Sequence, residues 1–162
     1  LRLAADLNWQ AVILGTGDSH LETSCRSLEA EFPDRVRALI KFDVGLSRRL
    51  YAGGDILLMP SRYEPCGLAQ MIAMRYGTVP LARATGGLRD TIRDDPTLAG
   101  STGFLFEEAQ PEAFAESLRR ALYAYPDRQV WESIQIRGME QDFSWKKSAI
   151  EYAQLYHQLS GR

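Results

Sequence analysis

The sequence predicts an α/β fold, in which a parallel sheet is covered by helices on both faces. Short, continuously apolar segments alternate along the chain with longer segments whose apolar residues recur at helical spacing. The apolar segments lack the polar alternation of half-exposed strands, as strands buried on both faces do. Glycine-containing turns separate the segments. Because ligands of such sheets bind beyond the carboxyl ends of the strands, we expect functional residues in the loops that follow strands.

The first half of the chain is expected to hold three strands, each followed by a helix. Residues 1–8 have the pattern of a helix end. The predicted strands are residues 11–14, 36–42 and 55–60, of which the first and the last are expected to be buried. The predicted helices are residues 19–32, 45–52 and 68–76. Asp18 or Ser19 can cap the first of these helices, and Gly77 ends the third.

The second half is predicted to hold two further strands and then mostly helix. The strands are residues 79–82 and 103–106, and a short helix begins at Gly86-Gly87 between them. Three longer helices follow, at residues 112–125, 127–139 and 144–159. Pro111 suits the first turn of the first, and Asp127 and Ser144 can cap the other two. Apolar residues of the last helix, from Trp145 to Leu159, recur at helical spacing.

Composition excludes several classes of protein. The chain has 162 residues, of which 45% are hydrophobic and 25% charged, enough for one compact domain with its own core. A net charge of −2 gives no electrostatic case for nucleic-acid or membrane binding. No apolar run approaches the ~20 residues needed to span a bilayer. Cys25 and Cys66 form no disulfide framework and have no metal-ligand spacing, so a cytoplasmic protein is expected.

The most informative segment is the loop after the third predicted strand, with the sequence Ser-Arg-Tyr-Glu-Pro-Cys-Gly-Leu at residues 61–68. Glu64 lies between a buried strand and the start of a helix, and Gly67 allows a ligand to approach the backbone. Helix N-termini attract phosphate, whereas a carboxylate at the same place would repel it. The combination suits glycosyl transfer, in which a positively charged sugar develops beside a phosphate.

Each candidate residue has a simpler interpretation. Gly15-Thr16-Gly17 lacks the third glycine of the dinucleotide fingerprint, which argues against NAD, and it can be a plain turn. An isolated residue such as Glu64 is usually solvated, and Cys66 is more often a packed small side chain than a nucleophile. Phe42 could belong to the core or, at a strand end, stack on a base.

Several segments show that the chain resembles bacterial glycogen synthases and plant starch synthases. The matching segments are residues 15–18, 61–68, 74–78, 83–88 with Asp90-Thr91, 102–104 and 142–145. These ordered segments extend through essentially the whole chain. Ile72, eight positions after Glu64 where many related transferases have a second Glu, is a feature of the bacterial synthases. Ala69 departs from a common Thr and removes one possible phosphate-facing hydroxyl.

The resemblance implies a two-domain GT-B fold with Rossmann-like halves, of which residues 1–162 would be most of the C-terminal, nucleotide-sugar-binding half. It implies retaining transfer of glucose from ADP-glucose to an α-1,4-glucan in the cytoplasm, or in a plastid if the source is a plant, without a metal or other cofactor. Glu64 would be the catalytic acidic residue facing the transferred glucose. The implied substrate-binding residues are Gly15, Gly17, Asp18, Phe42, Pro65, Cys66, Gly67, Leu68 and Ala69.

The resemblance also implies missing parts. The family's basic segment, whose Arg and Lys neutralise the diphosphate, would lie before Leu1, together with the first strand of this domain and the acceptor-binding domain. Two alternatives stay open: another retaining GT-B transferase, such as a sucrose- or trehalose-forming enzyme, and a non-catalytic domain that binds nucleotide sugar or glucan. The segment at residues 64–67 and Ile72 speak against the first alternative.

Overall fold

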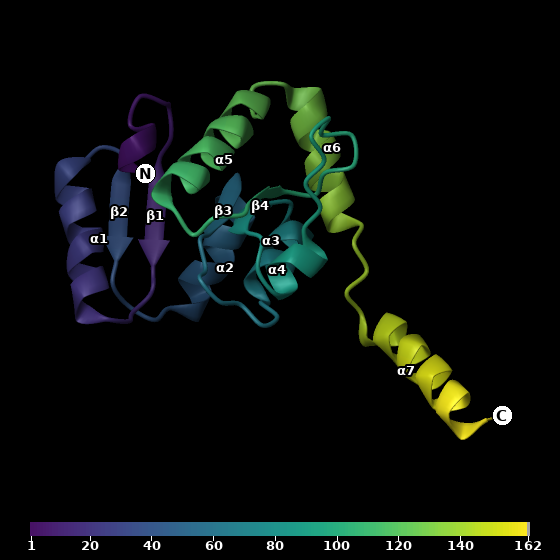
Figure 1. Ribbon diagram of the computed structural model, residues 1–162. Helices are drawn as coiled ribbons and strands as arrows, with labels where there is room; N and C mark the ends of the chain where they lie inside the picture. Colours follow the sequence, from purple (N-terminus) through teal and green to yellow (C-terminus); the bar gives the residue numbers. More distant parts are fainter. Residues whose placement is uncertain (162) are drawn as a thin grey trace.

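The computed structural model describes residues 1–161 and confirms the α/β fold (Figure 1). In chain order, the elements are the 3₁₀ helix η1 (Arg2–Ala4), β1 (Ala11–Leu14), α1 (Ser19–Glu31), β2 (Val36–Leu39), α2 (Val44–Gly53), β3 (Ile56–Met59), α3 (Ala69–Tyr76), β4 (Val79–Arg83), α4 (Gly87–Thr91), β5 (Phe104–Phe106), α5 (Pro111–Ala124), α6 (Arg128–Met139) and α7 (Trp145–Ser160). The predicted order is confirmed. The strand predicted at residues 36–42 is shorter, and residues 1–8 hold one 3₁₀ turn rather than the end of an α-helix.

The strands form two parallel sheets rather than the single sheet predicted. β1 pairs with β2, in a register that places Ala11 opposite Val36. β4 lies between β3 and β5, with Leu81 opposite Phe104. No strand within residues 1–161 joins β1 to β3, so each of these two strands has one unpaired edge.

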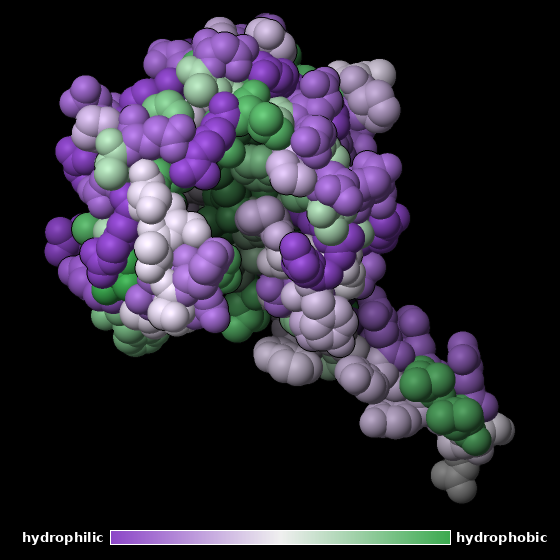
Figure 2. Space-filling model, turned by 60° about the vertical axis from the view of Figure 1, so that its left-hand side comes forward, coloured by the Kyte–Doolittle hydropathy of each residue, from purple (hydrophilic) through white to green (hydrophobic). Residues whose placement is uncertain are grey.

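The strands with unpaired edges are apolar and partly exposed. All four residues of β3 are half-buried and Val12 of β1 is 50% exposed, whereas the first four residues of β4 are buried. The predictions of buried strands at residues 11–14 and 55–60 are therefore wrong. No residue of β1 is buried, Asp55 and Pro60 are exposed, and β3 is half-buried. The reason is that β1 and β3 each have a neighbouring strand on one side alone. Figure 2, which turns the β1–β2 side of the molecule forward, shows a hollow lined by hydrophobic residues.

The main core lies between the second sheet and the helices α5 and α6. Leu81 of β4 and Phe104 of β5 pack with Leu118 of α5 and Ile134 of α6. Trp131 of α6 stacks on Phe104, with ring centroids 6.2 Å apart. This cluster fixes β4, which leads into the loops described below.

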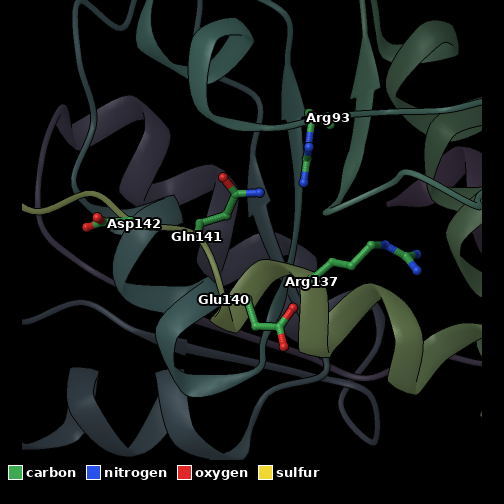
Figure 3. Close-up of a pocket in the computed structure, with 5 residues that line it drawn as sticks. All are labelled: Arg93, Arg137, Glu140, Gln141 and Asp142. Atoms are coloured by element: carbon green, nitrogen blue, oxygen red, sulfur yellow. The ribbon is translucent and has the colours of Figure 1, made fainter. Parts of the chain in front are cut away.

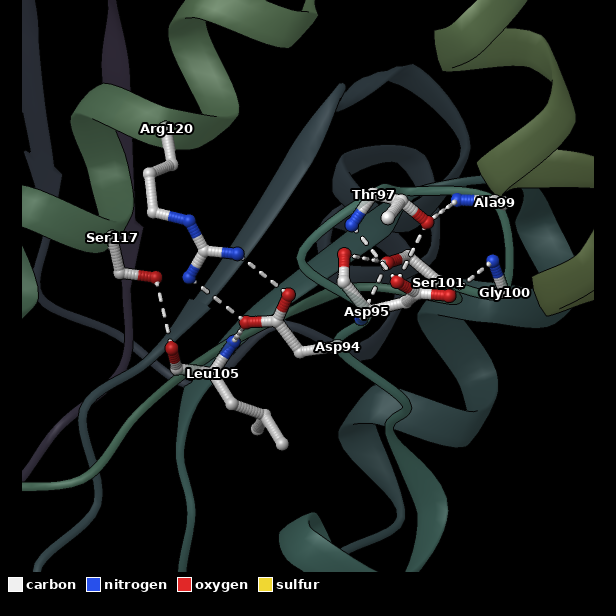
Figure 4. Close-up of polar contacts among 9 residues, drawn as sticks. All are labelled: Asp94, Asp95, Thr97, Ala99, Gly100, Ser101, Leu105, Ser117 and Arg120. Atoms are coloured by element: carbon white, nitrogen blue, oxygen red, sulfur yellow. Dashed lines mark hydrogen bonds and ion pairs between the residues drawn. The ribbon is translucent and has the colours of Figure 1, made fainter.

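Two neighbouring carboxylates fix the loop between α4 and β5 (Figure 4). Asp94 accepts hydrogen bonds from the Leu105 N–H at 2.8 Å and from the Arg120 guanidinium at 2.7 and 3.0 Å. Asp95 accepts from the Thr97 N–H at 2.8 Å and from the Gly100 N–H at 3.1 Å. The hydrogen bonds from Thr97 are the main reason that the pKa of Asp95 lies below its usual range. The loop is thereby tied to β5 and α5.

Helix α7 lies apart from the rest of the molecule (Figure 1), and none of its residues is buried. The predicted apolar positions are present but exposed, with Trp145 at 84% and Leu159 at 76%. Ser144 makes no side-chain cap, contrary to the prediction; its N–H instead donates to Asp142 Oδ1 at 2.9 Å. Neither α7 nor another helix of the described residues is long and apolar enough to cross a membrane.

Candidate active site

The loop between β3 and α3, residues 61–68, is held at its start by Arg83. Arg83 is the last residue of β4, next to β3 in the sheet. Its Nε donates to the Ser61 carbonyl at 2.9 Å, and its Nη2 donates to the Arg62 carbonyl. One charged side chain thus satisfies two loop carbonyls and fixes where the loop leaves the sheet. Arg83 was not among the site residues predicted from the sequence.

The middle of the loop rests against Gly86 and Gly87. The Gly87 N–H donates to the Glu64 carbonyl at 3.1 Å. A Cβ at Gly86 would lie 2.0 Å from the Glu64 carbonyl oxygen, and one at Gly87 would lie 2.0 Å from that of Cys66. These are close backbone approaches that only glycine permits. From the sequence, this pair was expected at the start of a helix, in a strand-end loop and within a segment shared with the synthases, but its contact with the loop at residues 61–68 was not predicted.

The end of the loop is an uncapped helix start. Gly67 has a left-handed conformation (φ 76°), and the N-cap Leu68 makes no side-chain cap. Within residues 1–161 the N–H groups of residues 67–70 donate to no acceptor. Leu68 is 67% exposed, and Ala69 is half-buried. Unsatisfied N–H groups and the positive end of the helix dipole make this an anion-binding geometry.

Glu64 is the carboxylate of this loop, four residues before the N-cap Leu68. Its side chain is half-buried and makes no hydrogen bond or ion pair with other described residues. Its backbone is fixed by Gly87, and the next residue, Pro65, has a restricted φ. Cys66 is an exposed free thiol whose Sγ lies 3.7 Å from the Gly67 carbonyl oxygen, with no histidine partner among its described contacts. The loop therefore carries an unpaired carboxylate and leads into free helix-start amides, groups that can stabilise positive and negative charge respectively, and its described contacts include no thiol–imidazole pair.

The remaining predicted residues lie on the other sheet. Phe42 follows β2 and is 86% exposed, so it is not part of the core. Asp18 caps α1, accepting from the N–H groups of His20 and Leu21, which confirms the cap predicted for this helix. A Cβ at Gly15 or Gly17 would meet open space. No hydrogen bond or ion pair among the described residues joins this group to the loop that carries Glu64. The structure therefore brings residues 64–69 together but does not connect them to Gly15, Gly17, Asp18 or Phe42.

A small polar pocket lies elsewhere, around the end of α6 (Figure 3). Its volume is about 270 Å³, and its lining residues are Arg93, Arg137, Glu140, Gln141 and Asp142. Arg137 is already engaged by the carbonyls of Leu98 and Ser101, at 2.8 Å each. None of the predicted site residues lines this pocket. Across the described residues, no group of three or more His, Cys, Asp or Glu side chains could hold a metal ion.

Known proteins of similar sequence are glycogen synthases. The chain is 50% identical over 158 residues to the glycogen synthase of Anaeromyxobacter sp. (strain Fw109-5), a match that covers 98% of this chain and 33% of the relative. It is 47% identical over 156 residues to the glycogen synthase of Kosmotoga olearia, covering 94% of this chain and 33% of the relative. The chain thus spans about a third of the length of these relatives.

Solved structures of glycosyl-transferring enzymes also match this chain. The catalytic domain of starch synthase IV from Arabidopsis thaliana, bound to ADP and acarbose, matches with a TM-score of 0.80 and 40% identity, over 94% of this chain and 33% of that one. Sucrose-phosphate synthase from Thermosynechococcus elongatus matches with a TM-score of 0.65 and 26% identity, over 94% of this chain and 39% of that one.

The resemblance to glycogen and starch synthases inferred from the motifs is confirmed by these matches. Residues 1–135 match the family described as glycosyl transferases group 1. With its parallel α/β architecture and its match over most of its length, the chain belongs to the glycosyl transferases group 1.

Proposed function

We propose that this chain is the nucleotide-sugar-binding part of an α-1,4-glucan synthase, which transfers glucose from ADP-glucose with retention of configuration. The observation that carries the proposal is Glu64, an unpaired carboxylate on a fixed loop, next to the uncapped start of α3. The relatives named above are glycogen synthases, and the starch synthase structure contains ADP and acarbose, a nucleotide and an oligosaccharide analogue.

The proposed chemistry uses both halves of this site. The bond between C1 of glucose and the diphosphate oxygen breaks, a bond from C1 to the acceptor hydroxyl oxygen forms, and the hydroxyl proton passes to the departing diphosphate. Negative charge grows on the departing diphosphate, where the N–H groups of residues 67–70 can stabilise it. Positive charge grows at C1, where Glu64 can stabilise it and orient the sugar. Pro65, Cys66 and Leu68 would contact the sugar and diphosphate, and Phe42, Gly15, Gly17 and Asp18 would line the nucleotide side.

We also propose that residues 1–162 are a C-terminal domain that lacks its first strand and a preceding basic segment. Support comes from the apolar strands β1 and β3, each of which has one unpaired edge in its own sheet. In doubly wound folds with strand order 3-2-1-4-5-6, the first strand lies between the second and the fourth, which β1 and β3 would be here. The acceptor glucan would bind chiefly to another domain. The free thiols of Cys25 and Cys66 favour a cytoplasmic setting.

A sucrose-phosphate-forming enzyme is the alternative within the fold. The starch synthase match has both the higher identity, 40% against 26%, and the higher TM-score, 0.80 against 0.65. A second alternative is a non-catalytic domain that binds nucleotide sugar. An activity assay on the complete protein containing this chain, with ADP-glucose and UDP-glucose in parallel, separates the three functions.

The decisive variant is Glu64→Ala in that complete protein. Loss of one electrostatic group that acts in the transition state lowers kcat by ~10²–10³-fold, with little change in donor affinity. Glu108→Ala, which removes an exposed carboxylate from another loop, is the matched control and should leave kcat unchanged. Near-normal kcat for Glu64→Ala would refute the role given to this residue.

A further inference from the structure

Gln70, in the first turn of α3, is a fully buried polar side chain that the mechanism above does not use. Its exposed fraction is 0%, and its Nε2 lies 3.1 Å from the Cys66 carbonyl, 3.0 Å from the Gly67 carbonyl and 3.1 Å from Thr91 Oγ1. Its Oε1 is buried and has no partner among the described residues. An unsatisfied buried acceptor destabilises the folded state. A methionine or leucine would fill this position without that cost, so packing alone does not account for the amide.

The two carbonyls bound by Gln70 belong to the same peptide groups as two of the unsatisfied N–H groups. In a trans peptide the C=O and the N–H point in opposite directions. When the Cys66 carbonyl points inward to Gln70, the Gly67 N–H therefore points away from Gln70. The Gly67 carbonyl also points to Gln70, so the Leu68 N–H of the same peptide group points away from Gln70.

The backbone conformation of these residues fits this arrangement. Gly67 has φ 76°, and Leu68 follows in the right-handed helical region with φ −105° and ψ −26°. Alternation of hand between successive residues is the pattern of an anion-binding nest, whose N–H groups converge on one ligand. Gln70 packs directly beneath this nest, because a Cβ at Gly67 would lie 2.5 Å from Gln70 Oε1.

Gln70 also ties the nest to α4. Thr91 Oγ1 accepts from Gln70 and donates to the Gly87 carbonyl at 2.6 Å. The Gly87 N–H in turn donates to the Glu64 carbonyl at 3.1 Å. Hydrogen bonds therefore connect the peptide groups at the start of α3 to Gln70 and Thr91. Through Gly87 they continue to the backbone of Glu64.

We propose that Gln70 is a positioning residue that holds the N–H groups of Gly67 and Leu68 outward for the diphosphate of the sugar nucleotide. The inference rests on the proposed function, because it assumes that a nucleoside diphosphate binds at the start of α3. Gln70 itself touches no ligand, since its polar atoms are buried. Its effect is on the direction of backbone donors.

The test is calorimetric binding of ADP and of adenosine to the complete protein containing this chain. Gln70→Leu keeps the side-chain volume and removes the donor. Hydrogen bonds to charged groups contribute about 1.5–3 kcal/mol, so ADP affinity should fall about tenfold or more. Adenosine affinity should not change, because adenosine has no phosphate. Gln135→Leu is the matched control: the Gln135 amide donates to the Gly77 carbonyl at 2.7 Å, at the opposite end of α3. It should leave the ADP-to-adenosine affinity ratio unchanged.

A second variant keeps the inference testable if Gln70→Leu does not fold. Gln70→Glu places acceptor oxygens against two carbonyls at pH 8, whereas its protonated form at lower pH can donate one hydrogen bond. Relative to wild type at the same pH, its ADP affinity should be reduced at pH 8 and partly recovered at pH 6. The inference would be overturned if the affinities for ADP and adenosine changed equally, or if neither variant changed the ADP affinity. As long as the wild-type protein binds ADP, either result would leave the proposed function intact. Wild-type protein that binds no ADP would overturn both.

Discussion

The contact between Gly87 and the loop that carries Glu64 gives a sharp prediction for Gly87→Ala. The added Cβ would lie 2.0 Å from the Cys66 carbonyl oxygen and 2.6 Å from both the carbonyl carbon and the Cα of Cys66. Carbon–oxygen contacts are normally about 3.3 Å or longer, so the two backbones must separate by roughly 1 Å. The neighbouring atoms are backbone, which cannot rotate away as a side chain can.

The displacement should reach the reacting groups. The Gly87 N–H holds the Glu64 carbonyl, so a shift of α4 against the loop moves both Glu64 and the start of α3. A misplacement of 1 Å costs about 10²-fold in rate, which corresponds to about 2.7 kcal/mol of transition-state stabilisation. Overpacking should also lower the free energy of unfolding by ~1–3 kcal/mol.

The assay is incorporation of labelled glucose into glycogen by the complete protein, together with denaturant unfolding of the same variant. Gly53→Ala is the control, because a Cβ at Gly53 meets nothing within 4 Å, and it should leave kcat unchanged. A folded Gly87→Ala protein whose kcat lies within a few-fold of wild type would refute the argument that this glycine positions the loop.

Three further predictions follow from the same features. Gly67→Val should weaken ADP binding, because valine is strained at φ 76° and its Cβ would clash with Gln70; unchanged affinity by calorimetry would count against placing the diphosphate at α3. The 162-residue chain alone should incorporate no labelled glucose into glycogen, and measured incorporation would show that the acceptor site is not on another domain. The same chain should self-associate and unfold with weak cooperativity, because β1 and β3 have unpaired edges. Extension by the preceding strand should give a monomer with a sharp unfolding transition. Calorimetry with sedimentation tests this, and a sharp transition of monomeric chain without the extension would contradict it.

The sequence by itself determined the order of the elements and the position of Glu64. These depend on local signals: Asp18 caps α1 through N–H groups two and three residues away, and Gly77 ends α3 in the left-handed conformation. The apolar runs likewise predict strands whatever surrounds them. The loop after β3 could therefore be identified as the candidate site before any contact was known.

Only the tertiary structure decided what holds that loop and what remains uncovered. The donors that fix it, Arg83 and Gly87, lie 22 and 23 positions from their partners Ser61 and Glu64, and no local pattern encodes that contact. The apolar residues of β3 predicted a buried strand, and this was wrong because exposure depends on which strands lie beside it. The apolar face of α7 illustrates the same point: helical spacing predicts a stripe, but only the fold shows that nothing in this chain's described residues covers it.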